Sequence, residues 1–598
     1  MKDSPIYEDL SLVHRRAAWI FRVVIFLFLV AGLYYWKTQI LDHGKYFALS
    51  EANRTRETIL SSPRGVLTDR NGKVVLADNQ ASFRASYVRE NAEDEAASVR
   101  AVAAVLEVEE AVIRERIAKY ASLPAFMPIV VKDRLTLEEV SRVEGRRNEL
   151  PELIIEAEPR RNYPFGSLAA HLLGYLKEVT SEGLRTDFRG RHLGDMVGTS
   201  GIEAAYESRL AGVDGTLYEV VDSQGRVRQE LQRIEPRPRP KLALTIDYDL
   251  QAKAEELLAG KEGAVVILDP RNGEILALAS SPTYDPNRFI NRFTPEEWQA
   301  LVSDPDDSLL DRAIQGLYSP GSLFKPVMAL AGLDTGTIVP GTTFFCGGAA
   351  VFYDRPFRCW LEGGHGSQAL VEAIQNSCNV FFYRVGSRLS IDTIARYAEM
   401  LGLGSPTGVE IPAEVSGLVP TSAWKKRTTK LPWYPGETIS VSIGQGYLMV
   451  TPLQIAAITA TLANRGRRIR PHFTTEDRRA APPSGPLATI AQDSFETIIE
   501  GMWRSVNKGG TGQAARVEGL DACGKTGSTQ TVSRETAERL AASGKPVKTH
   551  SWFSGFGPRH APEVVVTVLI EHGGMGGASA APVAGQLFAL HKLKKGSG

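Results

Sequence analysis

The chain has 598 residues, which is too long for one ordinary hydrophobic core, so at least two domains are expected. Its 69 basic and 69 acidic residues cancel, which argues against the strongly basic surface of a nucleic-acid-binding protein. No nucleic-acid partner is therefore expected.

Residues 17–36 read AAWIFRVVIFLFLVAGLYYW, an apolar run of the length that spans a bilayer. Arg15 and Arg16 precede it and favour a cytoplasmic N-terminus, and Arg22 lies near enough to that end to extend toward the same surface. A cleaved signal peptide is the alternative, but bulky aromatic residues stand where a cleavage site needs small ones. The sequence predicts a cytoplasmic tail at 1–16, a single-pass anchor at 17–36 in the cell (inner) membrane, and the bulk of the chain in the periplasm or extracytoplasmic space.

A first extracytoplasmic domain is expected at 37–238. Turn signals at Ser-Pro and Asn-Gly within 61–79 predict a hairpin, and residues 93–147 carry Ala, Glu, Arg and Val at helical spacing. Three prolines in EPRPRP, residues 235–240, mark a domain boundary near residue 238.

A second domain is expected at 239–594, followed by an added tail at 595–598. It opens with a helix at 249–260 and two strand-like runs within 263–280, joined by Asp-Pro-Arg-Asn-Gly. Helical segments fill the middle, and strands return at 550–558 and 561–573. Strands at both ends of a helical block predict an α+β fold with an antiparallel sheet flanked by helices.

The second domain contains YSPGSLFKPVMAL at 318–330, where Ser322 and Lys325 are three residues apart at the start of an apolar helix. Positions i and i+3 lie one above the other on a helix, so the lysine amine can reach the serine oxygen. The unpaired N–H groups of a first turn can also stabilise an oxyanion. A serine that only caps the helix, with a solvated lysine, is the alternative reading of this motif alone.

Two further motifs follow in the same domain: Ser377-x-Asn379, and Lys525-Thr526-Gly527 followed by Ser528 and Thr529. Each tripeptide is common in turns or strand ends. The combination of Ser-x-x-Lys, a Ser-Asn pair and Lys-Thr-Gly in this order is the set shared by β-lactamases and penicillin-binding proteins.

The three motifs together suit acyl transfer by a serine nucleophile. Lys325 can take the proton of Ser322 only when its amine is neutral, and both burial and the second cation, Lys525, would lower its pKa. Ser377 and Asn379 can relay that proton and hold a substrate amide.

The third motif suits the binding of a peptide end. Gly527 would let a substrate backbone come close to the strand, and the hydroxyls of Thr526 and Ser528 would bind a terminal carboxylate. We expect Thr529 to belong to the same substrate-binding set.

At this point the chain resembles the class B penicillin-binding proteins, the D,D-transpeptidases that crosslink peptidoglycan. The resemblance rests on RGVLTDRNGKVVLA, RRNYPFG, GTSGIEAAYE, PGSLFKP and SIGQGYLMVTPLQIA and covers nearly everything after the anchor. It implies an elongated pedestal (dimerisation-type) domain and a penicillin-binding transpeptidase domain, acting on stem peptides and acylated by β-lactam antibiotics. It also implies that Ser322 is acylated, that Lys325 is the base, and that the backbone N–H groups of Ser322 and Ser528 form the oxyanion hole.

Three other functions use related parts. A β-lactamase needs a deacylating base and neither an anchor nor a pedestal, and an antibiotic sensor would couple this fold to several membrane spans. A non-catalytic scaffold would be expected to lose at least one motif member, and none is lost here.

The stretch DRPFRCWLEGGHGSQALVEAIQNSCN resembles the elongation type of the class, which includes penicillin-binding protein 2, more than the division type. This resemblance implies two partners: a SEDS-family glycosyltransferase of the elongation machinery (RodA type) and a periplasmic activator (MreC type). A division-type protein is the alternative.

Three of the four cysteines lie in this same region with a histidine: Cys346, Cys359, His365 and Cys378. An exported chain favours disulfides, but three cysteines leave one over, and three thiolates with one imidazole make a closed tetrahedral zinc set. We therefore expect a structural zinc behind the second motif, with no cofactor needed for acyl transfer. A disulfide with one free thiol, or unlinked core cysteines, are the alternatives.

The resemblance to the elongation type also implies a zinc site at this place in some relatives, with aspartates at the first two of the four ligand positions. Cysteines should bind zinc more tightly than aspartates. If Ser377, Cys378 and Asn379 are locally extended, Cys378 points away from the other two and places the metal behind the motif.

Overall fold

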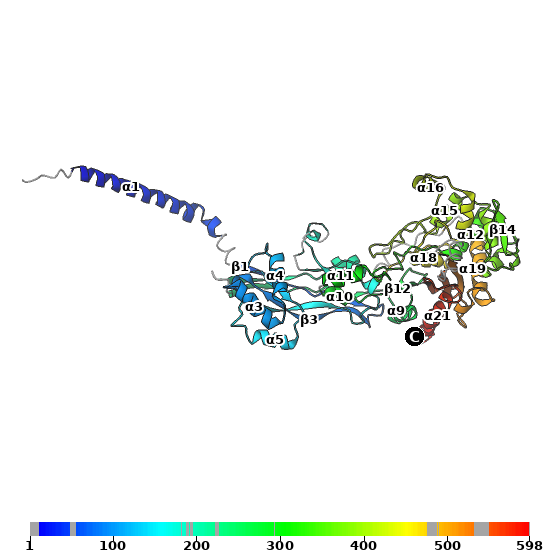
Figure 1. The fold of residues 1–598 in the computed structure, drawn as a ribbon, viewed down its shortest axis with the longest axis horizontal. Helices are drawn as coiled ribbons and strands as arrows, with labels where there is room; N and C mark the ends of the chain where they lie inside the picture. The colour runs from blue at the N-terminus through cyan, green and yellow to red at the C-terminus, as the bar shows by residue number, and fades with distance from the viewer. Residues whose placement is uncertain are drawn as a thin grey trace, which may run out of the picture. The chain divides into compact units, whose positions relative to one another are not determined.

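The structure is a computed structural model, and it describes residues 11–47, 55–180, 182–186, 191, 195–221, 227–291, 293–474, 487, 490–530 and 549–596. The chain divides into two compact units (Figure 1). The first contains residues 1–63, 81–159 and 212–238, and the second contains residues 64–80, 160–211 and 239–598.

An apolar helix, α1 (Ser11–Trp36), continues into a short π-helical turn, η1 (Lys37–Leu41). Its apolar side chains are exposed, and in the described part of the chain Val13–Leu41 is the one helix long and apolar enough to cross a membrane. The helix contains the predicted anchor at 17–36 and residues 11–16 of the predicted tail, whereas residues 1–10 lie outside the described ranges.

The first unit combines a three-stranded antiparallel sheet with a small helical layer. Strand β8 pairs with β1 on one side and β9 on the other. A separate core gathers apolar side chains such as Val99, Val102 and Leu106 around the buried Tyr87. The elements are β1 (Thr55–Leu60), the end of β3 (Val75–Tyr87), η2 (Arg89–Asn91), α3 (Glu95–Leu106), α4 (Glu110–Lys119), β4 (Ile129–Lys132), α5 (Leu137–Glu144), β5 (Leu153–Asn162), β8 (Gly215–Val221) and β9 (Val227–Ile234).

Part of the predicted pedestal belongs to the second unit, so the predicted domain at 37–238 is not one compact unit. Residues 64–80 and 160–211 cluster with the chain after residue 239. The predicted hairpin forms between β2 and β3, and β2 also pairs in parallel with β10, which lies beyond the predicted boundary. These segments contribute β2 (Leu67–Thr68), α6 (Ala170–Leu173), β6 (Leu176–Glu178), η3 (Gly183–Arg185), β7 (Met196–Gly198), α7 (Gly201–Ala205), α8 (Glu207–Leu210) and β10 (Leu242–Ala243).

A buried ion cluster holds these segments together. Glu203 is fully buried and accepts hydrogen bonds from Arg64 at 2.7 Å and Arg161 at 2.6 Å. These two arginines lower the pKa of Glu203 against the effect of its burial. A buried carboxylate with two cationic partners is satisfied electrostatically, which explains how it is tolerated in the core.

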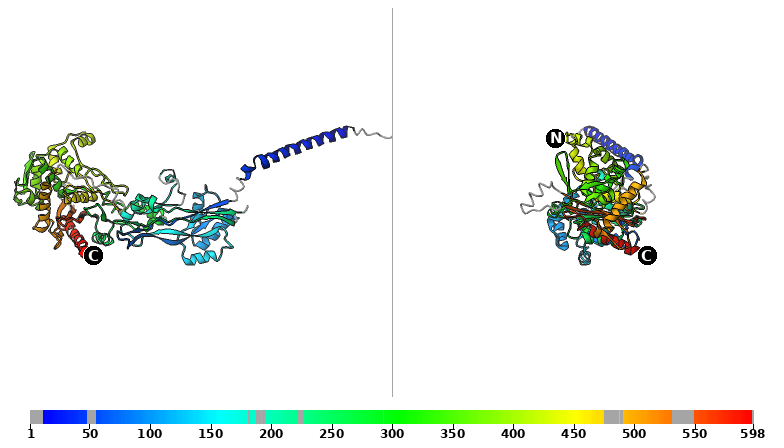
Figure 2. Two further views of the ribbon diagram at one scale, coloured as in Figure 1. Left: turned by 180° about the vertical axis from the view of Figure 1, so that it is seen from behind. Right: turned by 90° about the vertical axis from the view of Figure 1, so that its right-hand side faces the viewer.

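The central sheet of the second unit has the strand order β12-β11-β19-β18-β17, and all its pairings are antiparallel. Every residue of β11 is buried, because helices cover both faces. Val265 packs in the cluster of α9 and α21, while its neighbours Ala264 and Val266 pack in the cluster of α12 and α18. Helix α21, in red in Figures 1 and 2, packs in the first of these clusters and α18 in the second, so the two helices cover opposite faces of β11. The predicted antiparallel sheet flanked by helices is confirmed.

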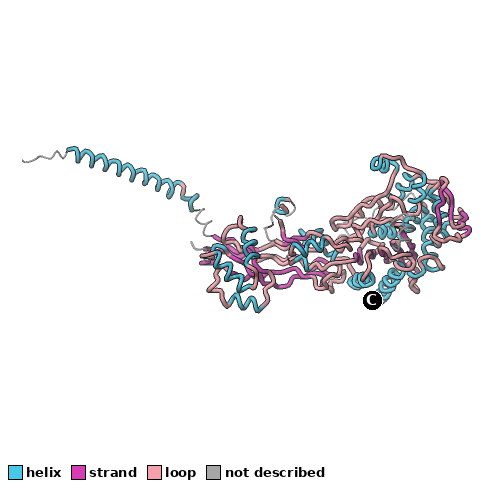
Figure 3. The backbone as a smooth tube through the Cα atoms, viewed as in Figure 1, coloured by secondary structure: helices cyan, strands magenta, loops and turns pink. Residues whose placement is uncertain are grey.

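Smaller elements surround the sheet. The strands and the helices before the first motif are α9 (Tyr248–Leu258), β11 (Gly263–Leu268), β12 (Ile275–Ser281), α10 (Asn287–Ile290), α11 (Pro295–Val302), β17 (Cys523–Thr529), β18 (His550–Gly557) and β19 (Val564–Ile570). Two short ribbons lie apart from the sheet, β13 (Phe344–Cys346) with β16 (Gly366–Gln368), and β14 (Ala349–Phe352) with β15 (Arg355–Arg358), as Figure 3 shows in magenta.

The remaining helices also belong to the second unit. They are η4 (Gly321–Phe324), α12 (Lys325–Asp334), α13 (Leu370–Gln375), α14 (Asn379–Gly386), α15 (Ile391–Met400), α16 (Ser422–Thr429), α17 (Pro435–Val441), α18 (Pro452–Ala463), α19 (Gln492–Asn507), η6 (Gln513–Ala515) and α21 (Ala580–Gly596). Helix α21 runs through two residues of the predicted added tail, and Lys595 forms an ion pair of 2.9 Å with Glu563. Residues 597 and 598 lie outside the described ranges.

Candidate active site

The first motif forms a tight 3-10 turn, η4, directly before helix α12. Ser322 is partly exposed within this turn and makes no capping hydrogen bond, so it is not the N-cap that the alternative reading required. Gly321 has φ +54°, and its N–H donates to the carbonyl of Gly444 at 2.9 Å. A Cβ at Gly321 would lie 2.4 Å from Thr529 Cγ2, so only glycine fits where the turn meets strand β17.

Lys325 is completely buried at the start of α12. Its Nζ donates to the Ser377 carbonyl and to Asn379 Oδ1, both at 2.8 Å, and lies 3.2 Å from Ser377 Oγ. The amine also lies 5.6 Å from the centre of the Phe382 ring. In the described part of the chain no hydrogen bond joins it to Ser322 Oγ. The structure therefore brings the first and second motifs together through the lysine.

Residues 377–379 of the second motif are not locally extended, which was the condition given for the expected placement of Cys378. Ser377 has φ +54°, Cys378 is extended, and Asn379 is the first residue of α14. This kinked path still separates the side chains as expected. Ser377 and Asn379 contact Lys325, whereas Cys378 faces a different cluster, because the left-handed residue reverses the chain direction before the helix begins.

The third motif occupies β17, the strand at the edge of the central sheet. A Cβ at Gly527 would meet the Pro320 carbonyl at 3.1 Å and Leu323 at 3.3 Å. This glycine therefore lets β17 pack closely against the turn that holds Ser322. From the sequence, a close approach of the substrate at this glycine was predicted instead. The side chain of Lys525, in the same strand, is buried. Ser528 Oγ accepts a hydrogen bond from the Gly576 N–H at 3.0 Å.

The hydroxyls of the third motif differ in their surroundings. Thr526 donates to the Thr511 hydroxyl at 2.7 Å. Thr529 is buried, and its hydroxyl has no partner in the described part of the chain.

Both lysines have lowered pKa values. Burial lowers the pKa of Lys325 to about 8, although the negative charges of Cys359 and Cys378 oppose this shift. Burial, together with repulsion from Lys325, lowers the pKa of Lys525 well below its ordinary value. The lowered pKa of Lys325 leaves a part of its amines neutral near neutral pH, and only those can act as a base.

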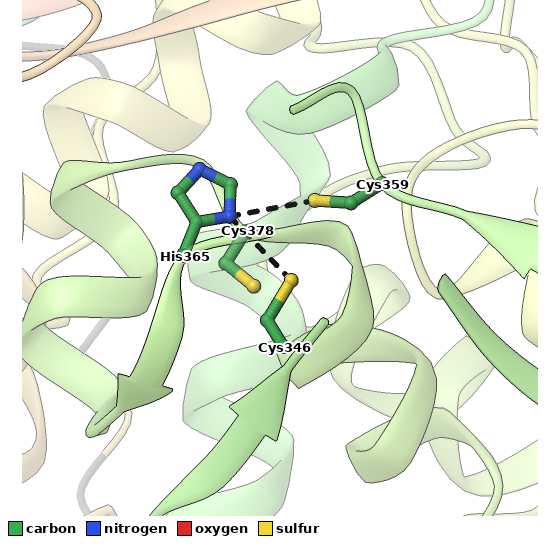
Figure 4. Close-up of side chains that lie close together, drawn as sticks. All are labelled: Cys346, Cys359, His365 and Cys378. Carbon is green, nitrogen blue, oxygen red and sulfur yellow. Dashed lines mark hydrogen bonds between the residues drawn. The ribbon is translucent and has the colours of Figure 1, made fainter. Parts of the chain in front are cut away.

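The four predicted metal ligands converge in one cluster (Figure 4). Their ligand atoms all lie within 4.8 Å of one another, and the Nδ1 atom of His365 lies 3.6 Å from the sulfurs of Cys346 and Cys359. None of the four cysteines forms a disulfide. Three sulfurs and one imidazole nitrogen facing one point fit tetrahedral zinc. The cluster touches the second motif directly, because the Asn379 N–H donates to Cys359 Sγ at 3.3 Å.

Two residues beside the second motif were not predicted. The Arg358 carbonyl accepts from Asn379 Nδ2 at 3.5 Å, and the Trp360 indole donates to the Asn376 carbonyl at 3.0 Å. Both flank the predicted ligand Cys359 in sequence, which was the one available signal for them.

Two family models match the chain. The Penicillin binding protein transpeptidase domain matches residues 263–589, and the Penicillin-binding Protein dimerisation domain matches residues 59–244.

Similar proteins include the peptidoglycan D,D-transpeptidases MrdA of Acinetobacter baumannii and Escherichia coli. The former is 33% identical over 96% of this chain and 87% of its own length, and the latter is 32% identical over 95% and 92%. Among solved structures, Helicobacter pylori PBP2 in complex with MreC has a TM-score of 0.79 at 27% identity, covering 90% of this chain and 99% of that chain. A chain of a peptidoglycan synthase complex has a TM-score of 0.70 at 31% identity, covering 97% and 98%.

Proposed function

The chain belongs to the penicillin-binding protein transpeptidase family, and from this premise we propose that it is an elongation-type peptidoglycan D,D-transpeptidase working through a serine acyl-enzyme. One observation carries the chemistry: the buried Lys325 amine, with its pKa lowered to about 8, sits 2.8 Å from Asn379 and next to the turn that holds Ser322. A neutral amine at this place is what a serine nucleophile needs as its base.

In the proposed reaction, Ser322 Oγ attacks the carbonyl of the penultimate D-alanine of a donor stem peptide. Lys325 takes the hydroxyl proton, and the proton then passes to the amine of the departing terminal D-alanine. The acyl group remains as an ester on Ser322 until an acceptor amine attacks it, loses a proton to the same lysine and restores the serine hydroxyl. Ser377 lies 3.2 Å from the lysine amine and can relay the proton to the leaving group.

The donor peptide would lie along β17, since an edge strand has one row of backbone groups free to pair with an extended peptide. The hydroxyls of Thr526 and Ser528 would take its terminal carboxylate. The backbone N–H groups of Ser322 and Ser528 would bind the oxyanion as the carbonyl becomes tetrahedral.

A structural zinc is part of this proposal. Cys346, Cys359, Cys378 and His365 would hold it, and the metal would supply rigidity and no chemistry to acyl transfer. Cys359 accepts the N–H of Asn379 at 3.3 Å, so the ligand set positions the residue that holds the base. Elemental analysis tests this: we expect about one zinc per chain, lost in Cys359→Ser together with slower acylation. Less than half an equivalent in the wild-type chain would refute the site.

The membrane placement and the partners also belong to the proposal. Arg15 and Arg16 favour a cytoplasmic start for α1, which would put both units outside the cytoplasm. Related chains are solved in a complex with MreC and in a peptidoglycan synthase complex. We infer an activator of the MreC type and a SEDS-family glycosyltransferase of the RodA type as partners of this chain.

Mass spectrometry after incubation with a fluorescent penicillin tests the function. We expect a long-lived adduct on Ser322, absent in Ser322→Ala and retained in Ser319→Ala, whose serine lies three positions earlier in the same segment. Turnover of the drug at β-lactamase rates, or label that persists in Ser322→Ala, would refute the proposal.

A further inference from the structure

We propose that Arg358 and Trp360 form an acceptor subsite that binds a free carboxylate of the stem peptide whose amine attacks the acyl-enzyme. This inference rests on the proposed transpeptidase function. It places the carboxylate of the acceptor peptide beside the second motif, Ser377 and Asn379.

A rigid hairpin carries the subsite. Strands β14 and β15 pair antiparallel and are joined by a tight turn in which Tyr353 and Asp354 have φ +52° and +58°. The ring of Phe357 lies 5.9 Å from Phe352 across the hairpin and 5.5 Å from Tyr383 of α14. These aromatic contacts fix one face of the hairpin to the helix that begins at Asn379.

The end of the hairpin touches the second motif. The Arg358 carbonyl accepts from Asn379 Nδ2 at 3.5 Å and from the Tyr383 hydroxyl at 3.2 Å. Two residues later, the Trp360 indole donates to the Asn376 carbonyl at 3.0 Å. The backbone of 358–360 is therefore held directly beside the asparagine that contacts the catalytic base.

The two side chains are available to a ligand. Arg358 is exposed, and in the described part of the chain its guanidinium has neither a hydrogen bond nor an ion pair. The Trp360 ring is 45% exposed although its N–H is already used. A guanidinium offers a planar pair of donors that matches a carboxylate, and an indole face packs against the adjoining peptide.

The acceptor fits this place better than the donor does. In the proposed function the donor carboxylate binds the hydroxyls of β17, and it leaves with the terminal D-alanine. Asn379 contacts both the base and the Arg358 carbonyl, so a peptide bound along the second motif would lie beside residue 358. An acceptor stem peptide with a free carboxylate near its amine would be both selected and oriented by this one arginine.

The test compares two acceptor peptides, one with a free carboxylate beside the acceptor amine and one with a carboxamide there. The purified full chain is acylated by a thioester donor, and transfer to each acceptor is measured with Arg358→Gln, Arg358→Lys and Arg355→Gln. Arg355 is the matched control, because it is an exposed arginine of the same strand next to the turn and away from Asn379.

For Arg358→Gln we expect kcat/KM of the carboxylate acceptor to fall about five- to tenfold, mainly through KM. The carboxamide acceptor and the rate of penicillin acylation should stay unchanged, Arg358→Lys should recover part of the loss, and Arg355→Gln should have no effect. Equal losses with both acceptors, slower acylation, or no change in KM would overturn the subsite. A wild-type chain that is not acylated at Ser322 would overturn the proposed function itself, and the subsite with it.

Discussion

The pH dependence of acylation should move when the charge beside the base is changed. Asn379 Oδ1 lies 2.8 Å from Lys325 Nζ, so Asn379→Asp places a carboxylate against a buried ammonium with almost no change in shape. An opposite charge at this distance favours the protonated lysine and raises its pKa by about 1–3 units. The nucleophile would then lose its base at neutral pH.

The magnitude follows from the wild-type pKa of about 8. Only the neutral amine can act as base, so acylation should rise with pH around a midpoint near 8, with about one lysine in eleven neutral at pH 7. A rise of about two units in Asn379→Asp would lower that neutral fraction about a hundredfold. The midpoint would move toward about pH 10.

Acylation by a fluorescent penicillin, timed between about pH 6 and 9.5, measures this shift. Gln375→Glu is the charge-matched control, because its partly exposed side chain donates to the Lys508 carbonyl and does not contact the lysine amine. A midpoint of Asn379→Asp equal to that of the wild type would refute the electrostatic argument. A lower plateau with an unshifted midpoint would assign Asn379 only to holding substrate.

Three further outcomes are expected. Glu203→Gln leaves the buried Arg161 without a carboxylate and Arg64 with Glu207 alone, and it should cost about 3–5 kcal/mol of unfolding free energy, which a chemical denaturation curve would show; a loss below about 1 kcal/mol would contradict this. Gly321→Ala should slow acylation at least tenfold because its Cβ meets Thr529, whereas Gly336→Ala, also at positive φ but in open space, should affect stability alone; equal effects would contradict the steric argument. Replacing 17–36 by an unrelated membrane helix should weaken complex formation with the glycosyltransferase partner, and an intact complex would assign the contact to the rest of the chain.

Local sequence patterns predicted the elements of the central sheet well. The run GAVVILDPRNGEILALAS becomes β11 and β12 because Asp-Pro-Arg-Asn-Gly can only turn, and both flanking runs are apolar enough to be covered on two faces. The order of the strands was not predictable in the same way. Strand β19 lies beside β11 although about 300 residues separate them in the chain, and no local signal encodes that pairing.

The division into two units likewise depends on contacts between distant segments, which local sequence patterns do not encode. Composition indicated a boundary near residue 238, but residues 64–80 and 160–211 belong to the second unit. The reason is a set of long-range contacts: β2 pairs with β10, and Glu203 joins arginines 139 and 42 residues away. Buried ion pairs between distant segments leave no periodic pattern in the sequence.

The spacing of the motif residues predicted which side chains gather in the candidate site, but it did not predict the backbone conformation of residues 377–379. Separation of Cys378 from Ser377 and Asn379 was expected on the condition of an extended path, and the structure has a different path. An extended strand and a left-handed residue followed by a helix give the same separation of side chains, so spacing alone does not decide the backbone path.

The backbone path matters because it couples the metal ligands to the base. Asn379 donates its N–H to Cys359 and accepts from Lys325 through Oδ1, so a single residue spans the distance between the sulfur cluster and the amine. Its Nδ2 is left to face the Arg358 carbonyl at 3.5 Å. Any movement of the cysteines must therefore move the partner of the base and the hairpin beside it together. A substitution at Cys359 should change acylation and acceptor selection in the same variant, whereas Arg358→Gln should change acceptor selection alone.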